Sequence, residues 1–194
     1  MSDLRIAIII GSTRPGRKSE SVARWILEQS EVRDASYELV DLAEHPLPFF
    51  NEPMSPAMGQ YDEKFQRDWS QVISQYDGYV FVTPEYNHSY SAVLKNAIDM
   101  LYTEWTDKAA AFVGYGGAGG ARAVEHLRGV AAEMQLAGVR TQMAFSLMTD
   151  FENFQTFAPG PQHLPRVQVM FDQLERWAGA LKPLREADKD PHEH

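Results

Sequence analysis

The sequence predicts an α/β protein, a three-layer sandwich whose central five-stranded parallel sheet has the strand order 2-1-3-4-5. Short apolar runs alternate with helical segments along the 194 residues, and parallel sheets joined by crossover helices produce this alternation. The most irregular loops follow the first, third and fourth strands, as expected where the winding of the sheet reverses. Five strands fit this order better than the six-stranded dinucleotide-binding fold.

Each expected strand is a short run of apolar or alternating residues. Residues 4–10 form a continuous β-branched run that stops at Gly11, which is typical of a strand buried on both faces. Pro84 ends the third run, because proline cannot continue a hydrogen-bonded ladder. The strands are expected at residues 4–10, 37–42, 78–83, 109–114 and 139–147.

Helical periodicity marks the segments between these strands. Val22, Ile26 and Leu27 recur at a spacing that places them on one face, toward the sheet. Four prolines between positions 46 and 56 instead predict a rigid extended loop. We expect one domain over residues 1–182 and a flexible polar tail over 183–194. Helices are expected at residues 19–30, 61–75, 92–101, 121–136 and 167–181.

The net charge of −9 and the absence of cysteine narrow the classes of function. An acidic protein is repelled by nucleic acids and by anionic membranes, so neither is an expected partner. Without cysteine there is no disulfide framework, thiol catalysis or thiolate metal site. The histidines show no metal-ligand spacing, and we expect no metal site. The sequence shows no signal peptide and no apolar run that would span a bilayer, so we expect a cytoplasmic protein.

The loop at positions 11–19 has the residues to bind a phosphate group. It leads into the amino end of a helix, where free backbone N–H groups and the helix dipole favour an anion. Its basic residues concentrate positive charge on an acidic protein, and its hydroxyls can donate hydrogen bonds; the last serine is also a suitable helix N-cap. The alternative is a plain turn with a solvated basic edge. The candidate ligands are Ser12, Arg14, Arg17, Lys18 and Ser19.

The loop after the third strand supplies aromatic and amide groups. A flat heteroaromatic ring needs an aromatic or peptide face against it and amide groups at its edge. The alternative is a structured turn in which Asn87 or Ser89 caps the next helix. The residues expected to line such a ring are Pro84, Glu85, Tyr86 and Asn87.

The loop after the fourth strand contains a glycine pattern that matches a dinucleotide fingerprint. Gly114 to Gly119 fit G-x-G-x-x-G between a strand and a helix. That fingerprint belongs on the first strand–helix turn of its domain, and no acidic residue ends the next strand here to hold a ribose. We therefore interpret the loop as bare backbone that a flat ring can approach closely, with a simple packing turn as the alternative. Its candidate residues are Gly116, Gly117, Ala118 and Gly119.

These three loops are expected to converge. The carboxyl ends of the first, third and fourth strands are neighbours in this strand order, and ligands of open α/β sheets bind at that edge. A phosphate at the first loop and a flat ring between the other two describe a mononucleotide, which has one phosphate and no second nucleotide half.

Four motifs resemble those of the NAD(P)H-dependent FMN reductase family, the flavodoxin-like quinone, azo-dye and chromate reductases. They occur in order between about Arg5 and Gly138, and together they are more specific than any single motif. Family members often carry a serine at the position of Arg17 and an asparagine at that of Ser19, so the contacts of these two positions differ here. The motifs are GSTR at 11–14, PEYN at 84–87, LKNAID at 94–99 and GYGG at 114–117.

The resemblance implies a flavodoxin-like fold with FMN as cofactor and NADPH or NADH as co-substrate. Ser12 and Arg14 would bind the flavin phosphate, residues 84–87 would line the isoalloxazine and residues 116–119 would approach its pyrimidine side. Homodimers or homotetramers are implied, with residues 94–105 as the candidate interface. The small-molecule electron acceptor would be free flavin, a quinone, an azo compound or a metal oxyanion.

The chemistry expected from this resemblance is hydride transfer through the flavin. Because the flavin carries the hard chemistry, we assign no catalytic acid or base to the protein, and Glu85 is expected to orient the ring or the loop. One alternative is an electron carrier of the flavodoxin type that does not oxidise NAD(P)H. A second alternative is a mononucleotide-binding module that never carries flavin.

Overall fold

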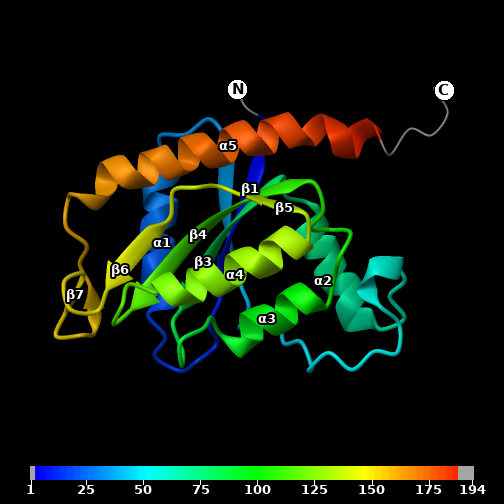
Figure 1. The fold of residues 1–194 in the computed structure, drawn as a ribbon, viewed down its shortest axis with the longest axis horizontal. Helices are drawn as coiled ribbons and strands as arrows, with labels where there is room; N and C mark the ends of the chain where they lie inside the picture. Colours follow the sequence, from blue (N-terminus) through cyan, green and yellow to red (C-terminus); the bar gives the residue numbers. More distant parts are fainter. Residues whose placement is uncertain (1–2, 188–194) are drawn as a thin grey trace.

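The computed structural model describes residues 3–187, in which strands and helices alternate along the chain (Figure 1). Each expected helix is present, with some differences in its bounds. The strands are β1 (Arg5–Ile10), β2 (Ser36–Asp41), β3 (Gly78–Pro84), β4 (Lys108–Gly116), β5 (Leu136–Gly138), β6 (Met143–Ser146), β7 (Phe151–Glu152) and β8 (Thr156–Phe157). The helices are α1 (Ser19–Ser30), α2 (Lys64–Ser74), α3 (Ala92–Asp99), α4 (Ala121–Glu133) and α5 (His163–Ala187), with a short 3₁₀ helix η1 (Pro56–Met58).

The sheet has the predicted strand order β2-β1-β3-β4-β5, and its neighbouring strands are parallel. β6 also pairs with β4, beyond the end of β5. In Figure 1, helices lie on both sides of this sheet. The predicted three-layer, flavodoxin-like α/β sandwich is therefore confirmed.

Two apolar cores lie on opposite faces of the sheet. α1 and α5 cover one face through side chains such as Val22, Ile26 and Phe171, none of which is exposed. α2, α3 and α4 cover the other face, with Trp69 and Leu127 at most 1% exposed. Full burial of one large apolar side chain stabilises the fold by about 1.5–3 kcal/mol. The two cores therefore hold the sheet as a firm frame for the loops at its edges.

The register of the sheet brings the carboxyl ends of three strands together. Ile10 of β1 lies beside Val82 of β3, and Pro84 at the end of β3 lies beside Tyr115 of β4. The amide of Gly11 donates to the carbonyl of Val82 at 2.8 Å, and a Cβ at this glycine would lie 2.6 Å from that oxygen. The three loops thus start from adjacent points at one edge, and the first one needs glycine there.

The expected fifth strand, at residues 139–147, is wrong in its bounds. Two short strands take its place, of which β5 pairs with the start of β4 and β6 with its end. The guanidinium of Arg128 in α4 donates to the carbonyls of Val139 at 2.8 Å and Arg140 at 3.3 Å. These carbonyls face the helix, which interrupts the ladder between the two strands. α4 also ends earlier than expected, because Leu136 already belongs to β5.

α5 begins before and continues past the predicted helix, and Pro183 lies inside it. Near the end of α5, the guanidinium of Arg185 donates to the carboxylate of Asp77 at 2.5 Å. This ion pair links the last turns of the helix to the rest of the fold. The first residues of the expected flexible tail, 183–187, are therefore helical. The remainder of that tail, 188–194, lies outside the described residues.

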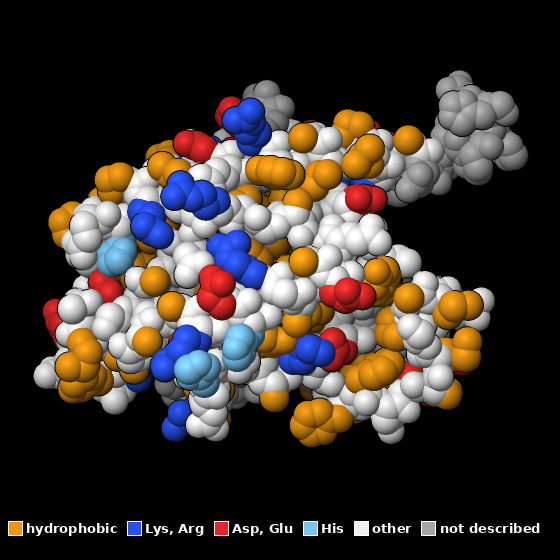
Figure 2. Space-filling model, in the orientation of Figure 1, with side chains coloured by type: hydrophobic (Ala, Val, Ile, Leu, Met, Phe, Trp, Pro, Cys, Tyr) orange, Lys and Arg blue, Asp and Glu red, His pale blue; other side chains and the backbone are white. Residues whose placement is uncertain are grey.

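The outer face of α5 is partly apolar. Figure 2 shows apolar side chains along this helix, and Trp177 and Leu184 are each 51% exposed. The inner face of the helix is buried at the same time, through residues such as Phe171. None of the helices within residues 3–187 combines the length and the apolar composition that a membrane span requires.

The segment expected to form a subunit interface, residues 94–105, buries its apolar side chains within the protein itself. Leu94, Ile98 and Trp105 are at most 2% exposed and belong to the core on that face of the sheet. On the outside, Lys95 and Asp99 pair with each other one helical turn apart. These apolar side chains therefore stabilise the protein's own core, and the expected interface stays a prediction.

Candidate functional site

The three predicted loops surround one cavity of about 410 Å³ at the carboxyl edge of the sheet. Their convergence, expected from the strand order, is confirmed by this geometry. A shallower neighbouring cavity is lined by Arg14, Glu85, Tyr86 and Asn87. Among the other predicted site residues, Ser12, Ser19 and residues 117–119 line neither of these two cavities. The predicted residues that line the cavity of about 410 Å³ are Arg14, Arg17, Lys18, Pro84, Glu85, Tyr86 and Gly116.

The first loop leaves a series of backbone N–H groups available at the amino end of α1. Within residues 3–187 these amides donate to no protein acceptor, whereas the amide of Arg17 donates to the carbonyl of Arg14 at 3.0 Å. Unpaired amides at a helix amino terminus favour an anion. The predicted N-cap is wrong, because α1 already includes Ser19 and Lys18 takes the cap position. The available amides are those of Ser12, Thr13, Gly16 and Lys18.

The three cations of the first loop have different partners. Arg14 is exposed, and in the described part of the chain its side chain forms no hydrogen bond or ion pair. Arg17 pairs with Asp41 at the end of β2 and lies 3.7 Å from Glu20. Lys18 donates to the side-chain oxygen of Gln155 at 3.1 Å. Arg14 is therefore the cation with the greatest freedom to meet an anion.

One buried polar atom beside the cavity lacks a partner. Arg17 Nε is buried and forms no hydrogen bond within residues 3–187, whereas Ser19 contacts the phenol of Tyr115. A buried donor without a partner costs about 1–3 kcal/mol, so such groups mark a place where a polar ligand would be stabilising. Ser12 is different, because its hydroxyl lies 3.0 Å from the hydroxyl of Tyr86 and joins the first loop to the second.

The second loop is a tight turn. The amide of Tyr86 donates to the carbonyl of Ser89 at 2.8 Å and the reverse bond is 3.1 Å. Asn87 and His88 between them have φ of 48° and 75°, which matches the type I′ turn that connects short antiparallel segments. The helix cap is Ser91, which accepts from the amide of Leu94 at 3.3 Å. The loop is thus a structured turn, but neither Asn87 nor Ser89 caps α3.

Glu85 is held by an ion pair and is not free to act as an acid. Its side chain is 5% exposed and pairs with Arg122 at the start of α4, whose Nε donates to Oε1 at 2.6 Å. Burial alone would raise the pKa of Glu85, but hydrogen bonds and positive charge from Arg122 outweigh it and lower the pKa. The expectation that Glu85 orients the loop agrees with this arrangement.

The glycines of the third loop serve two different purposes. A Cβ at Gly120 would lie 2.5 Å from the amide nitrogen of Tyr115, and one at Gly114 would lie 2.8 Å from the carbonyl oxygen of Gly120. These contacts support the simpler interpretation of a packing turn for part of the loop. Gly117 has open space around the position of a Cβ, and its amide and that of Ala118 donate to no acceptor within residues 3–187. The tip of the loop is therefore bare backbone.

Besides Pro15 and Gly16 of the first loop, three residues of the cavity wall were missed by the sequence analysis. Tyr115 lies at the end of β4, Leu147 follows β6 and Gln155 belongs to the turn between β7 and β8. Burial raises the pKa of Tyr115, so its phenol is a hydrogen-bond donor at neutral pH. Tyr115 falls inside the third loop and was within reach of the sequence pattern, whereas nothing in the sequence around Gln155 indicated a position beside the first loop.

The residues present fit a flavin mononucleotide. The free amides of the first loop and the guanidinium of Arg14 form a set of donors suited to one phosphate group. The second and third loops offer Tyr86 and the bare backbone at Gly117 to a flat ring. A cavity of this kind, with polar groups at a few positions, is typical of small-ligand sites.

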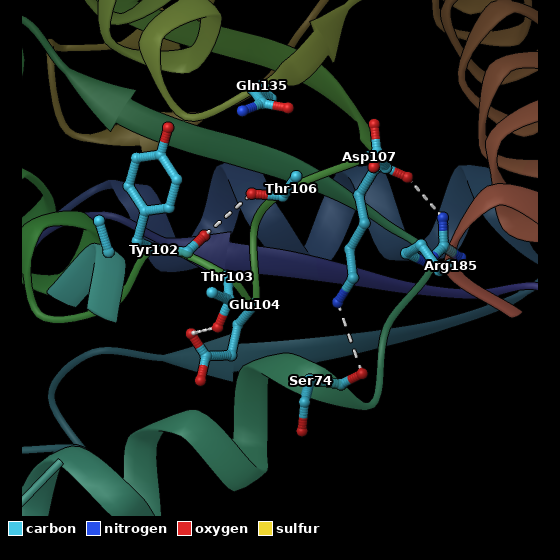
Figure 3. A pocket seen from close by; sticks show the side chains of 10 residues that line it. Ser74, Tyr102, Thr103, Glu104, Thr106, Asp107, Gln135 and Arg185 are labelled. Carbon is cyan, nitrogen blue, oxygen red and sulfur yellow. Dashed lines mark hydrogen bonds between the residues drawn. The ribbon is translucent and has the colours of Figure 1, made fainter. Parts of the chain in front are cut away.

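A second cavity, of about 580 Å³, lies at the opposite edge of the sheet (Figure 3). Glu104 and Asp107 there precede β4, Gln135 precedes β5 and Arg185 comes from the end of α5. At this edge the chain passes from helix to strand, so no strand-to-helix loop presents amides as the first loop does. Nucleotides bind at the carboxyl edge of such sheets, which places the candidate site at the smaller cavity.

Proteins named as reductases are similar to this chain. A family model described as NADPH-dependent FMN reductase matches residues 4–150. An NAD(P)H-dependent FMN reductase of Schizosaccharomyces pombe is 39% identical over 149 residues, which cover 75% of this chain and 74% of that protein. A 2-hydroxy-1,4-benzoquinone reductase of a Burkholderia species is 34% identical over 143 residues, 69% of this chain and 73% of that protein.

Solved structures share the fold. The flavoenzyme NAD(P)H:(acceptor) oxidoreductase FerB of Paracoccus denitrificans has a TM-score of 0.71 to this chain. The match covers 91% of this chain and 98% of that one, at 21% sequence identity. At this level of identity the likeness concerns the fold alone.

Proposed function

Because the chain belongs to the NADPH-dependent FMN reductase family, we propose that its three converging loops hold FMN at the carboxyl edge of the sheet. The chain is an NAD(P)H-dependent oxidoreductase with FMN as its cofactor. The observation that carries the placement is the cavity of about 410 Å³, because all three loops reach it. The first loop places the cations Arg14, Arg17 and Lys18 in its wall.

In this proposal the phosphate of FMN occupies the first loop. The amides before α1 and the exposed guanidinium of Arg14 donate to its oxygens. Ser12 and Ser19 are buried within the loop, and their hydroxyls are further donors to the phosphate in this proposal. Arg17 contributes less than its charge suggests, because Asp41 already pairs with it.

The isoalloxazine ring lies between the second and third loops. Residues 84–87 line one side of the ring. Tyr86 lines both neighbouring cavities, and Asn87 lines the shallower one. Gly116 to Gly119 approach its pyrimidine side, where the free amides of Gly117 and Ala118 suit the ring's carbonyl oxygens. The ion pair of Glu85 with Arg122 fixes the second loop to α4.

FMN supplies the hydride chemistry when it is bound, by accepting a hydride from the nicotinamide and passing it on. The protein's own contribution is orientation, because hydride transfer requires the two rings to be stacked and aligned. We assign no residue as acid or base. The acceptor is a small molecule that follows the nicotinamide into the same site, as in a ping-pong reaction.

A quinone is a reasonable first acceptor to test, because the Burkholderia relative is a 2-hydroxy-1,4-benzoquinone reductase. Free flavin, azo compounds and metal oxyanions belong in the same panel. An electron carrier without NAD(P)H oxidation is the less favoured alternative, since the relatives reported above are reductases. We also propose that the protein is cytoplasmic and forms a homodimer or homotetramer. Light scattering of the purified protein would test the oligomeric state.

The direct test is steady-state kinetics of the purified protein loaded with FMN. Both NADH and NADPH are supplied with each acceptor, and oxidation is followed at the nicotinamide absorbance band. We expect FMN-dependent oxidation with at least one acceptor and saturation by both substrates. Absence of turnover with every acceptor would contradict the reductase activity. A protein that shows no flavin absorbance and no FMN binding in a titration would contradict the placement of the cofactor.

A further inference from the structure

A hairpin beyond the family match forms part of the cavity wall. The match ends at residue 150, and β7 and β8 follow as an antiparallel pair with Phe151 opposite Phe157. Gln155, in the turn of this hairpin, lines the cavity together with Arg14 and Lys18 of the first loop. The hairpin therefore adds to the cavity a wall that the family match does not cover.

Aromatic packing and a buried carboxylate hold this hairpin on the body of the protein. The ring of Phe157 lies 4.9 Å from that of Phe145 and 6.2 Å from that of Trp25, between centroids. At the base of the hairpin, Asp150 is 3% exposed, and its carboxylate lies 2.7 Å from Nε2 of His163. The position of the hairpin turn is thus determined by contacts on both of its strands.

The turn itself has an unusual backbone. Asn153 and Phe154 have φ of 50° and 57°, and a positive φ is rare for a bulky side chain such as phenylalanine. The amide of Gln155 donates to the carbonyl of Glu152 at 2.9 Å, so Asn153 and Phe154 occupy the central positions of a type I′ turn, the turn type also found in the second loop. The ring of Phe154 is 53% exposed. Gln155 follows directly and is presented toward the first loop.

Gln155 orders a cation of the first loop. Nζ of Lys18 donates to Oε1 of Gln155 at 3.1 Å. A lysine side chain has several rotatable bonds, whose freedom is lost when its ammonium group binds a phosphate. A contact that orders Lys18 beforehand reduces that entropic cost. Within residues 3–187 the side-chain nitrogen of Gln155 donates to no acceptor, so it remains available to a phosphate oxygen.

We propose that Gln155 is a positioning residue that holds Lys18 at the phosphate end of the cavity. The hairpin then favours FMN over riboflavin, which is the same flavin without the phosphate. This inference rests on the proposed function, which places the FMN phosphate in the first loop. Because the contact between Lys18 and Gln155 is exposed, its effect is modest in size and specific to phosphate.

The experiment measures the Kd of FMN and of riboflavin by fluorescence titration for the wild type and four variants. These are Q155A, K18A, the double variant K18A/Q155A and the control E152Q. Glu152 is exposed in the same hairpin and does not line the cavity. Thermal unfolding of each variant shows whether the fold is retained, and FMN dissociation rates after dilution give an independent readout of retention.

We expect Q155A to raise the Kd of FMN about three- to tenfold and that of riboflavin less than twofold. K18A is expected to have the larger effect, because a charge is lost. Q155A should add little once Lys18 is absent, since interacting residues are non-additive. The control E152Q should bind both flavins as the wild type does.

Three results would overturn the inference: an FMN Kd for Q155A within twofold of the wild type, equal losses for FMN and riboflavin, or full additivity in the double variant. Failure of the proposed function is distinguishable from these. If R14A leaves the preference for FMN over riboflavin unchanged, the phosphate does not lie in the first loop at all.

Discussion

Replacement of Arg14 tests the proposed phosphate site most directly, because its side chain does not contribute to the stability of the fold. It is exposed and forms no hydrogen bond or ion pair in the described part of the chain. R14A is therefore expected to leave the melting temperature nearly unchanged. A charge-assisted hydrogen bond contributes about 1.5–3 kcal/mol, which converts to a rise of about 10- to 150-fold in the Kd of FMN.

Arg17→Ala is the matched comparison. Arg17 pairs with Asp41, and the two side chains are 17% and 15% exposed. Removing Arg17 leaves that carboxylate without its partner, which costs about 1–2 kcal/mol, between the values for exposed and buried pairs. R17A is therefore expected to lower the melting temperature by several degrees while weakening FMN less than R14A does.

Fluorescence titration with FMN and riboflavin, together with calorimetric melting, separates the two effects. The loss in R14A should concern FMN and spare riboflavin, because the contact proposed for the guanidinium is with the phosphate. An unchanged FMN affinity in R14A, or an equal loss for riboflavin, would refute the argument. So would a reversed order, in which R17A weakens FMN more than R14A and stays fully stable.

Two further predictions concern the third loop and its neighbour. G120A is expected to destabilise the protein by about 2 kcal/mol or more, because the new Cβ would lie 2.5 Å from the amide nitrogen of Tyr115. G117A should fold normally and weaken FMN binding. Thermal melting and FMN titration measure both variants, and equal effects of the two would contradict this distinction. R122A should lower stability at pH 7 by about 1–2 kcal/mol, as measured by denaturant unfolding. The pKa of Glu85 is lowered in the fold. The stabilisation from its ion pair is therefore present above the pKa of Glu85 in the unfolded chain, and it is lost as pH falls through the pKa in the folded protein. R122A should lose less stability than the wild type on acidification below about pH 4.5, and a parallel loss in both proteins would refute the role of the pair.

Local sequence patterns predicted most of the strands and helices. The strand that ends before Gly11 could be predicted from its own composition, because a strand buried on both faces is apolar almost throughout. α1 was bounded correctly at both ends, since its apolar residues recur at one helical spacing. The fifth strand failed because its interruption depends on Arg128 reaching two carbonyls from another element, and no local pattern encodes such a contact.

The cap of α1 was mispredicted for a related reason, and the capping alternative for the second loop is also wrong. Ser19, Asn87 and Ser89 are all suitable cap residues by type, yet Lys18 and Ser91 occupy the caps. Cap preference contributes about 1 kcal/mol, which tertiary packing easily outweighs. Ser19 is instead drawn into the helix and buried beneath the cavity.

By itself, the sequence determined the α/β alternation, the strand order and the edge where the three loops meet. These follow from local periodicity and from the handedness of crossover connections, which apply to any chain with this pattern. Only the tertiary structure decided which cation of the first loop stays free, since Asp41 and Gln155 come from β2 and a distant hairpin. Contacts between residues more than a hundred positions apart depend on the packing of the whole chain, and so the wall formed by Gln155 became visible only in the fold.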